Sequence, residues 1–135
     1  MASDGTNWLV VYSSWDFSAA RVYIKARRVA AAGQLVDSRT LLLGSAEHDF
    51  YPDVAYNGVY FVTWQENESS IGNIRARRVD SGGGVLDPTA IPVATSTDPE
   101  AAPAVAQGKD GGVGLVYERG SLPSNYIEFN KVTPK

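Results

Sequence analysis

The chain has 135 residues, enough for one domain with a hydrophobic core and too few for two of ordinary size. Its formal net charge of −3 provides no positive field, so we expect neither nucleic acid nor an anionic membrane as a partner. Its lack of cysteine excludes disulfides, thiol catalysis and thiolate-bound metals. Since no apolar run approaches the ~20 residues of a membrane helix and no signal-peptide pattern is visible, we expect a soluble chain of undetermined compartment.

One short sequence motif occurs more than once in the chain. Ile-Lys-Ala-Arg-Arg-Val at residues 24–29 returns about fifty residues later as Ile-Arg-Ala-Arg-Arg-Val at 74–79, and in a degraded form at 127–132. A match this close in so short a window indicates an internal repeat rather than chance. We therefore assign a single repeat domain over residues 1–135. Its units are about 3–51, 52–102 and 103–135, and the first and last of these are incomplete.

Short strands separated by turns fit every unit. The first unit is expected to begin with its second strand, near residues 8–12, and to continue with a third strand at 24–29. In the second unit, Asn57-Gly58 predicts a type I′ hairpin turn, which needs positive φ at both central residues. Gly82-Gly83-Gly84 predicts a further turn. The second unit has four expected strands, at residues 53–56, 59–65, 73–79 and 90–95. The third unit repeats the first three strands, which gives about ten strands in all.

No segment shows sustained helical periodicity, so the fold class is all-β. Four-stranded units of 40 to 50 residues are typical of β-propeller blades. The repeated phrases at Trp8–Tyr12, Ile24–Val29 and Pro52–Ala55 also resemble a family of bacterial tandem-repeat proteins of β-propeller type. The unit of that family reads roughly P-x-V-A, Y-L-V-V-W, I-Y-A-x-R-V and G-x-x-L-D. The resemblance implies about three blade-like antiparallel sheets per chain, and it implies no reaction.

A closed propeller needs at least four blades, so about three would leave apolar faces on the first and last units. We expect a homo-oligomer in which two chains join first unit to last unit and close a six-bladed ring. Two alternatives stay open: the chain is a piece of a longer propeller, or it closes on itself as a small sandwich.

Aromatic residues recur at the end of the second strand, with acids just beyond them. Aromatic rings beside carboxylates can hold sugars, because the ring stacks on an apolar sugar face while the acid accepts hydroxyl groups. Packing between blades explains the same aromatic pattern. A long connection adds an exposed aromatic residue, Trp15. The candidate ligand-binding residues are therefore Tyr12, Trp15, Asp16, Trp64, Glu66, Tyr117 and Glu118.

The single histidine, His48, lies between Glu47 and Asp49. Imidazole and carboxylate together suit zinc binding and proton transfer. The matching stretch of the next unit, Asp98-Pro99-Glu100, keeps the acids without the histidine. We therefore predict a solvated loop here, and we expect no metal and no cofactor.

Two arginine pairs, Arg27-Arg28 and Arg77-Arg78, could bind a carboxylate, phosphate or acidic sugar bidentately. Neighbouring strand positions face opposite ways, however, which disfavours a shared site. We expect these arginines to pair with acids of the chain, such as Asp16, Asp37, Glu66 and Asp87.

Catalysis has little support in the sequence. A glycosidase needs two carboxylates at a defined separation, and no spacing here is typical of such a pair. The Asp-box motif of sialidase propellers, the nucleophile elbow and the phosphate-binding loop are all absent. We expect a non-catalytic binding or scaffold module that assembles into a ring, with carbohydrate as the leading ligand class. The alternative is a glycan-acting hydrolase whose site forms only in the assembled ring.

Overall fold

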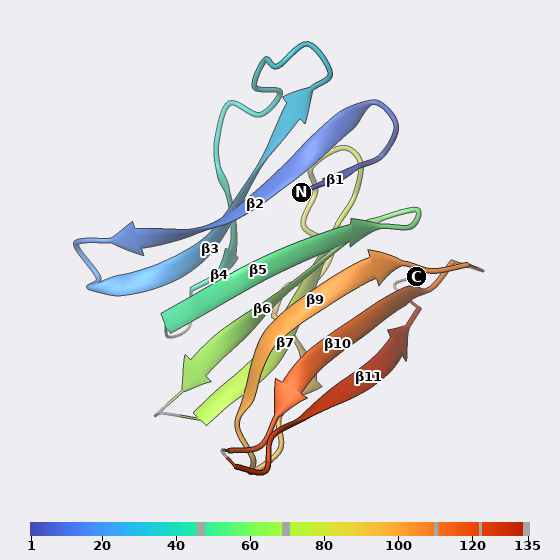
Figure 1. The fold of residues 1–135 in the computed structure, drawn as a ribbon. Coiled ribbons are helices and arrows are strands. Elements are labelled where there is room, and N and C mark those ends of the chain that lie inside the picture. Colours follow the sequence, from blue (N-terminus) through green and yellow to red (C-terminus); the bar gives the residue numbers. More distant parts are fainter. Residues whose placement is uncertain (46–47, 69–70, 110, 122, 134–135) are drawn as a thin grey trace.

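The computed structural model describes residues 1–45, 48–68, 71–109, 111–121 and 123–133. Every regular element in these ranges is a β-strand, which confirms the predicted all-β class. The strands form three antiparallel sheets, two with four strands and one with three. The sheets follow one another along the chain, and Figure 1 shows the middle one lying between the other two.

Each sheet is built from strands that are consecutive in the chain. Sheet 1 contains β1 (Ala2–Ser3), β2 (Asn7–Asp16), β3 (Arg21–Ala30) and β4 (Leu41–Gly44). Sheet 2 contains β5 (His48–Tyr56), β6 (Tyr60–Glu68), β7 (Ile71–Val79) and β8 (Ile91–Ala94). Sheet 3 contains β9 (Glu100–Gln107), β10 (Val113–Arg119) and β11 (Tyr126–Val132). The first strands of sheets 2 and 3, β5 and β9, run side by side (Figure 1).

The three sheets share one register. In an antiparallel pair, residues directly opposite each other lie on the same face. We call face A of each sheet the face that carries such a corresponding pair, and face B the opposite one. The pairs that define face A are Trp8 and Val29, Tyr60 and Val79, and Val113 and Val132.

The hydrophobic core has two layers, one at each junction between sheets. Face B of sheet 1 packs on face A of sheet 2, and the buried residues there are Leu9, Ile24, Ala26, Leu43, Val54, Tyr60, Val62, Trp64 and Val79. Face B of sheet 2 packs on face A of sheet 3, and the buried residues there are Ala55, Phe61, Ile74, Ala76, Ala94, Val113, Leu115 and Tyr117. Sheet 2 is therefore the only sheet of the described chain with core residues on both faces.

Two expectations about strand limits were wrong. The first unit does not begin with its second strand, because Asp4 Oδ1 accepts the backbone N–H groups of Thr6 and Asn7 and folds the chain back, so that β1 can pair with β2. Strand β5 also begins at His48, ahead of Pro52, although the sequence predicts a loop there. A bulge, with Tyr51 at a φ of 52°, lets the strand continue through this point.

The hairpin at Asn57-Gly58 forms, but its turn type was predicted incorrectly. Three residues separate β5 from β6, and the backbone N–H of Asn57 donates to the carbonyl of Val59 at 3.0 Å. A type I′ turn needs positive φ at both Asn57 and Gly58, and of these two residues only Gly58, in the middle of the loop, has it, with a φ of 82°. The turn predicted at residues 82–84 is present, with Gly83 N–H donating to the Asp80 carbonyl.

The buried layer between sheets 1 and 2 gives a first prediction. Val62 has no exposed surface, so Val62→Asp places an unpaired carboxylate in the core and is expected to cost about 4 kcal/mol or more, enough to prevent folding. The control Val36→Asp, at a side chain that is 42% exposed, is expected to stay within about 0.5 kcal/mol. Circular dichroism with urea titration measures both. A folded Val62→Asp variant would contradict the assigned core.

Candidate functional site

Two of the predicted arginine–acid pairs are present, at matching places in sheets 1 and 2. Arg28 Nη2 lies 2.6 Å from Asp37 Oδ1, and Arg78 Nη2 lies 2.7 Å from Asp87 Oδ1. Each aspartate also accepts the backbone N–H of its arginine at 2.7 Å. Strands β3 and β7 are thereby tied to the loops that follow them. These arginines are part of the scaffold, which leaves them engaged rather than presented to a ligand.

Arg27 and Arg77 do not follow the prediction of acidic partners. Arg27 Nη2 donates to the backbone carbonyl of Asp37 at 2.9 Å, and Arg77 Nη2 donates to that of Pro88 at 3.1 Å. Both lie on face A, opposite to their neighbours in the strand. The physical reason is position: the acid after each strand is already held by the arginine on face B.

The predicted aromatic residues hold one position in three successive sheets, and the structure does not bring them together. Tyr12, Trp64 and Tyr117 all lie on face A of their own sheets. Trp64 is buried against sheet 1 and Tyr117 against sheet 2, whereas Tyr12 is exposed. Two of the three rings are thus core residues, as the packing interpretation holds.

The predicted acids occupy three different settings. Asp16 Oδ1 accepts the backbone N–H groups of Ser18 and Ala19 at 2.9 and 3.0 Å and stabilises the β2–β3 turn. Glu66 is buried and accepts a hydrogen bond from Arg75 Nε at 2.7 Å. Glu118 is exposed on face B of sheet 3. No two of these three carboxylates are cross-strand partners, but Glu66 lies directly opposite the buried Asp49 of β5.

One pair of neighbouring polar side chains on the second and third strands occurs in all three sheets, with different residue types in each. This pair was not predicted from the sequence. In sheet 2, Glu66 on β6 pairs with Arg75 on β7. In sheet 3 the charges are reversed, and Arg119 Nη1 lies 3.5 Å from Glu128 Oε1. In sheet 1 Lys25 Nζ donates to Ser14 Oγ at 3.2 Å. The sequence does contain a signal for this pair. When the second and third units are aligned, Glu66 corresponds to Arg119 and Arg75 corresponds to Glu128, so the acid and the base are exchanged.

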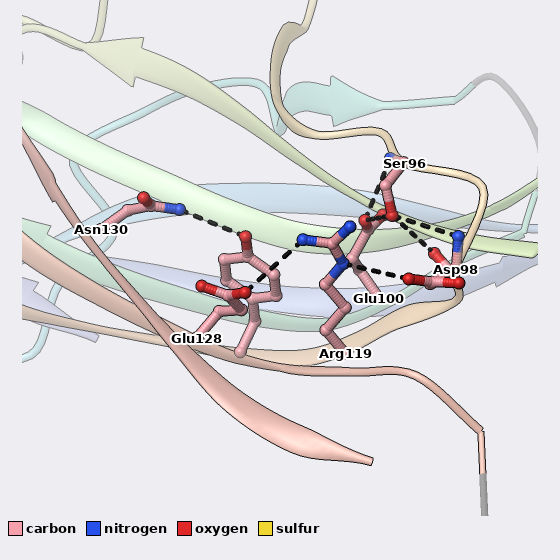
Figure 2. A network of polar contacts seen from close by, with 7 residues as sticks. Ser96, Asp98, Glu100, Arg119, Glu128 and Asn130 are labelled. Carbon is pink, nitrogen blue, oxygen red and sulfur yellow. Dashed lines mark hydrogen bonds and ion pairs between the residues drawn. The ribbon is translucent and has the colours of Figure 1, made fainter. Parts of the chain in front are cut away.

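A polar network surrounds the sheet 3 pair (Figure 2). The carboxylate of Glu100 is buried and accepts the hydroxyl and the backbone N–H of Ser96, at 2.5 and 3.0 Å. Arg119 Nε lies 3.4 Å from Asp98 Oδ2. The network joins β9 and β10 to the connection from β8 and holds that connection in place.

Aromatic side chains form a row where β2 ends and β5 begins. Trp15 lies beside His48 with ring centroids 6.0 Å apart and planes 16° apart, and His48 lies beside Phe50 at 6.1 Å with planes 15° apart. Phe17 meets the edge of Trp15 at 6.4 Å, and Tyr51 lies 6.1 Å from Phe50. The loop predicted around His48 is therefore wrong: the histidine lies in a strand between two aromatic rings. Glu47 lies outside the described residues.

Among the described residues, no three or more His, Asp or Glu side chains are grouped so that they could hold a metal ion. No helix in that part of the chain is long and apolar enough to cross a membrane. Comparison with protein-family models, with curated proteins and with solved structures gives no match. What the chain does has to follow from its own residues.

The Arg28–Asp37 pair gives a pH-dependent prediction. Burial raises the pKa of Asp37, but the hydrogen bonds from Arg28 outweigh it and hold this pKa below its ordinary value of 3.8. A lowered folded-state pKa adds stability that is fully present above 3.8 and is lost as the pH falls through the folded value. Asp37→Asn is expected to lower the free energy of unfolding by about 1 to 2 kcal/mol at neutral pH.

The same deficit is expected to be smaller at about pH 3, because the stability that comes from the lowered pKa of Asp37 is already being lost below its ordinary value of 3.8. Urea denaturation at both pH values measures it, with Glu118→Gln as a control at an exposed carboxylate. A deficit that is equal at the two pH values would show that the charge of Asp37 is not what stabilises this loop.

The reversed pair in sheet 3 predicts that the pair in sheet 2 can also be reversed. Glu66→Arg and Arg75→Glu each leave like charges in contact, and each is expected to destabilise the fold. The double variant reproduces the arrangement of Arg119 and Glu128, so a double-mutant cycle in urea is expected to give a favourable coupling of about 1 to 3 kcal/mol. Simple addition of the two single losses would mean that the partners do not interact.

Proposed function

We propose that this chain is a propeller-type scaffold and binding module that closes into a ring by joining sheet 1 of one copy to sheet 3 of a second copy. The observation that carries the proposal is a pair of exposed faces. One is face A of sheet 1, and the other is face B of sheet 3. The same faces are buried wherever a neighbouring sheet covers them within the chain.

Face A of sheet 1 carries exposed aromatic side chains beside Lys25 and Arg27, and no sheet of the chain covers it. Trp8 is 42% exposed and Tyr12 is 36% exposed. The residues at the same register positions in sheet 2, Tyr60 and Trp64, have no exposed surface because sheet 1 lies on them. The exposure of sheet 1 therefore comes from a missing neighbour and not from a polar surface pattern.

Face B of sheet 3 shows the same contrast. Ile127 and Phe129 are 67% and 64% exposed. The corresponding residues of sheet 2, Ile74 and Ala76, are completely buried against sheet 3. Exposed apolar side chains gathered on one strand face are costly in water and mark interaction sites.

The occupant that fits both faces is a second copy of this chain. Within the chain, every buried junction joins face B of one sheet to face A of the next. Face B of sheet 3 and face A of sheet 1 are the two halves of a junction of this kind. Two copies related by a two-fold axis can form two such junctions and close six sheets into a ring.

Light scattering coupled to size-exclusion chromatography tests the assembly. We expect a mass close to twice the chain mass of 14.5 kDa over a range of concentrations. Phe129→Asp and Trp8→Asp each place a charge in both junctions of the ring and are expected to yield monomers. Phe17→Asp, on the β2–β3 turn, serves as the control and is expected to leave the mass unchanged. A monomeric parent chain would overturn the proposal.

Mixing the two monomeric variants tests the head-to-tail arrangement. A dimer of one Phe129→Asp copy with one Trp8→Asp copy has both changes in one junction and leaves the other junction intact. Partial recovery of the dimer on mixing is expected for this reason. If identical faces joined instead, only one of the variants would dissociate and mixing would restore nothing.

A further inference from the structure

We propose that the aromatic row at the junction of sheets 1 and 2 is a binding site for a neutral, β-linked glycan chain. The row consists of Phe17, Trp15, His48, Phe50 and Tyr51. It lies within one chain and belongs to neither exposed sheet face, so this proposal does not depend on ring closure.

The row is open to solvent at both ends. Phe17 is 89% exposed, Tyr51 is 64% exposed and Trp15 is 48% exposed. The planes of Trp15 and His48 differ by 16°, and those of His48 and Phe50 by 15°, so three neighbouring rings are nearly parallel. Exposed aromatic surface gathered in one place on a protein this small marks a binding site.

The scaffold does not require these rings. At the junction of sheets 2 and 3 the register positions of Trp15, His48, Phe50 and Tyr51 are held by Asn67, Pro99, Ala101 and Ala102. The backbone is kept, because Ala102 has a φ of 50° and Tyr51 one of 52°. The same backbone therefore forms with and without the aromatic row. Because folding does not require these rings, they are available to bind a ligand.

The turn between β2 and β3 holds Phe17 at the surface without using its ring. Four residues, 17–20, connect β2 to β3, and Ala20 adopts a φ of 51°. Asp16 Oδ1 holds the turn through the N–H groups of Ser18 and Ala19. The turn is fixed by its backbone, so the ring of Phe17 is not needed to maintain it.

The chemistry of the row points to a sugar chain. Aromatic rings bind pyranose rings through stacking on their apolar C–H faces, and β-linked chains present such faces one after another along a flat ribbon. Rings spaced 6.0 and 6.1 Å apart suit a ligand whose units repeat on the same scale. The net charge of −3 disfavours an acidic polysaccharide, so the fitting ligand is neutral.

Isothermal titration calorimetry with cellohexaose, chitohexaose, xylohexaose and mannohexaose tests the site. We expect at least one hexaose to bind the parent chain and Trp15→Ala to weaken that binding by about tenfold, the loss of one stacking contact. Tyr51→Ala and Phe17→Ala are expected to weaken it by a smaller factor. Both side chains are mostly exposed, so these two variants are expected to fold. They test the site even if Trp15→Ala fails to fold.

The control variant is Trp8→Asp, which removes the ring junction and is expected to leave glycan binding unchanged. Loss of binding in this variant alone would place the site in the assembled ring and not in the aromatic row. Failure of all four hexaoses to bind, equal affinity in the parent and the row variants, or binding of decaproline instead of sugar would overturn the proposal.

Discussion

A β-sheet with two apolar faces has to be covered on both sides, and this constraint governs the whole molecule. Sheet 2 satisfies it, because Trp64 is buried on one face and Phe61 on the other. Sheets 1 and 3 each satisfy it on one side only. The hydrophobic contribution of the uncovered faces, about 25 cal/mol for each Å² removed from water, becomes available only on contact with another surface. The case for assembly follows from this arrangement.

Pairs of charged side chains set the positions of individual strands and loops, which apolar burial alone would not determine. Arg28 and Arg78 each reach a carboxylate in the following loop, and this tie sets the direction in which the chain leaves the third strand. The pair of Glu66 with Arg75 joins two strands of one sheet, and its reversed copy in sheet 3 shows that the interaction is retained while the charges are exchanged. Such contacts are specific to position, whereas apolar packing tolerates exchange of similar side chains.

Positions that are shared between sheets and positions that are unique have different meanings. The shared ones, such as Ile24 and Ile74, are buried and describe what any sheet of this kind needs. The aromatic row has no counterpart at the second junction, so folding does not explain it.

The sequence by itself determined the all-β class, the turn at residues 82–84 and the pairing of Arg28 and Arg78 with acids of the chain, because these depend on local periodicity, glycine and opposite charge. It could not place His48, since Pro52 indicated a strand start and only a bulge at Tyr51 allows the strand to begin earlier. Tertiary structure decided which aromatic residues are buried: Tyr12 and Trp64 hold one register position, yet only Trp64 has a sheet packed against it. Burial depends on neighbours that no local pattern encodes.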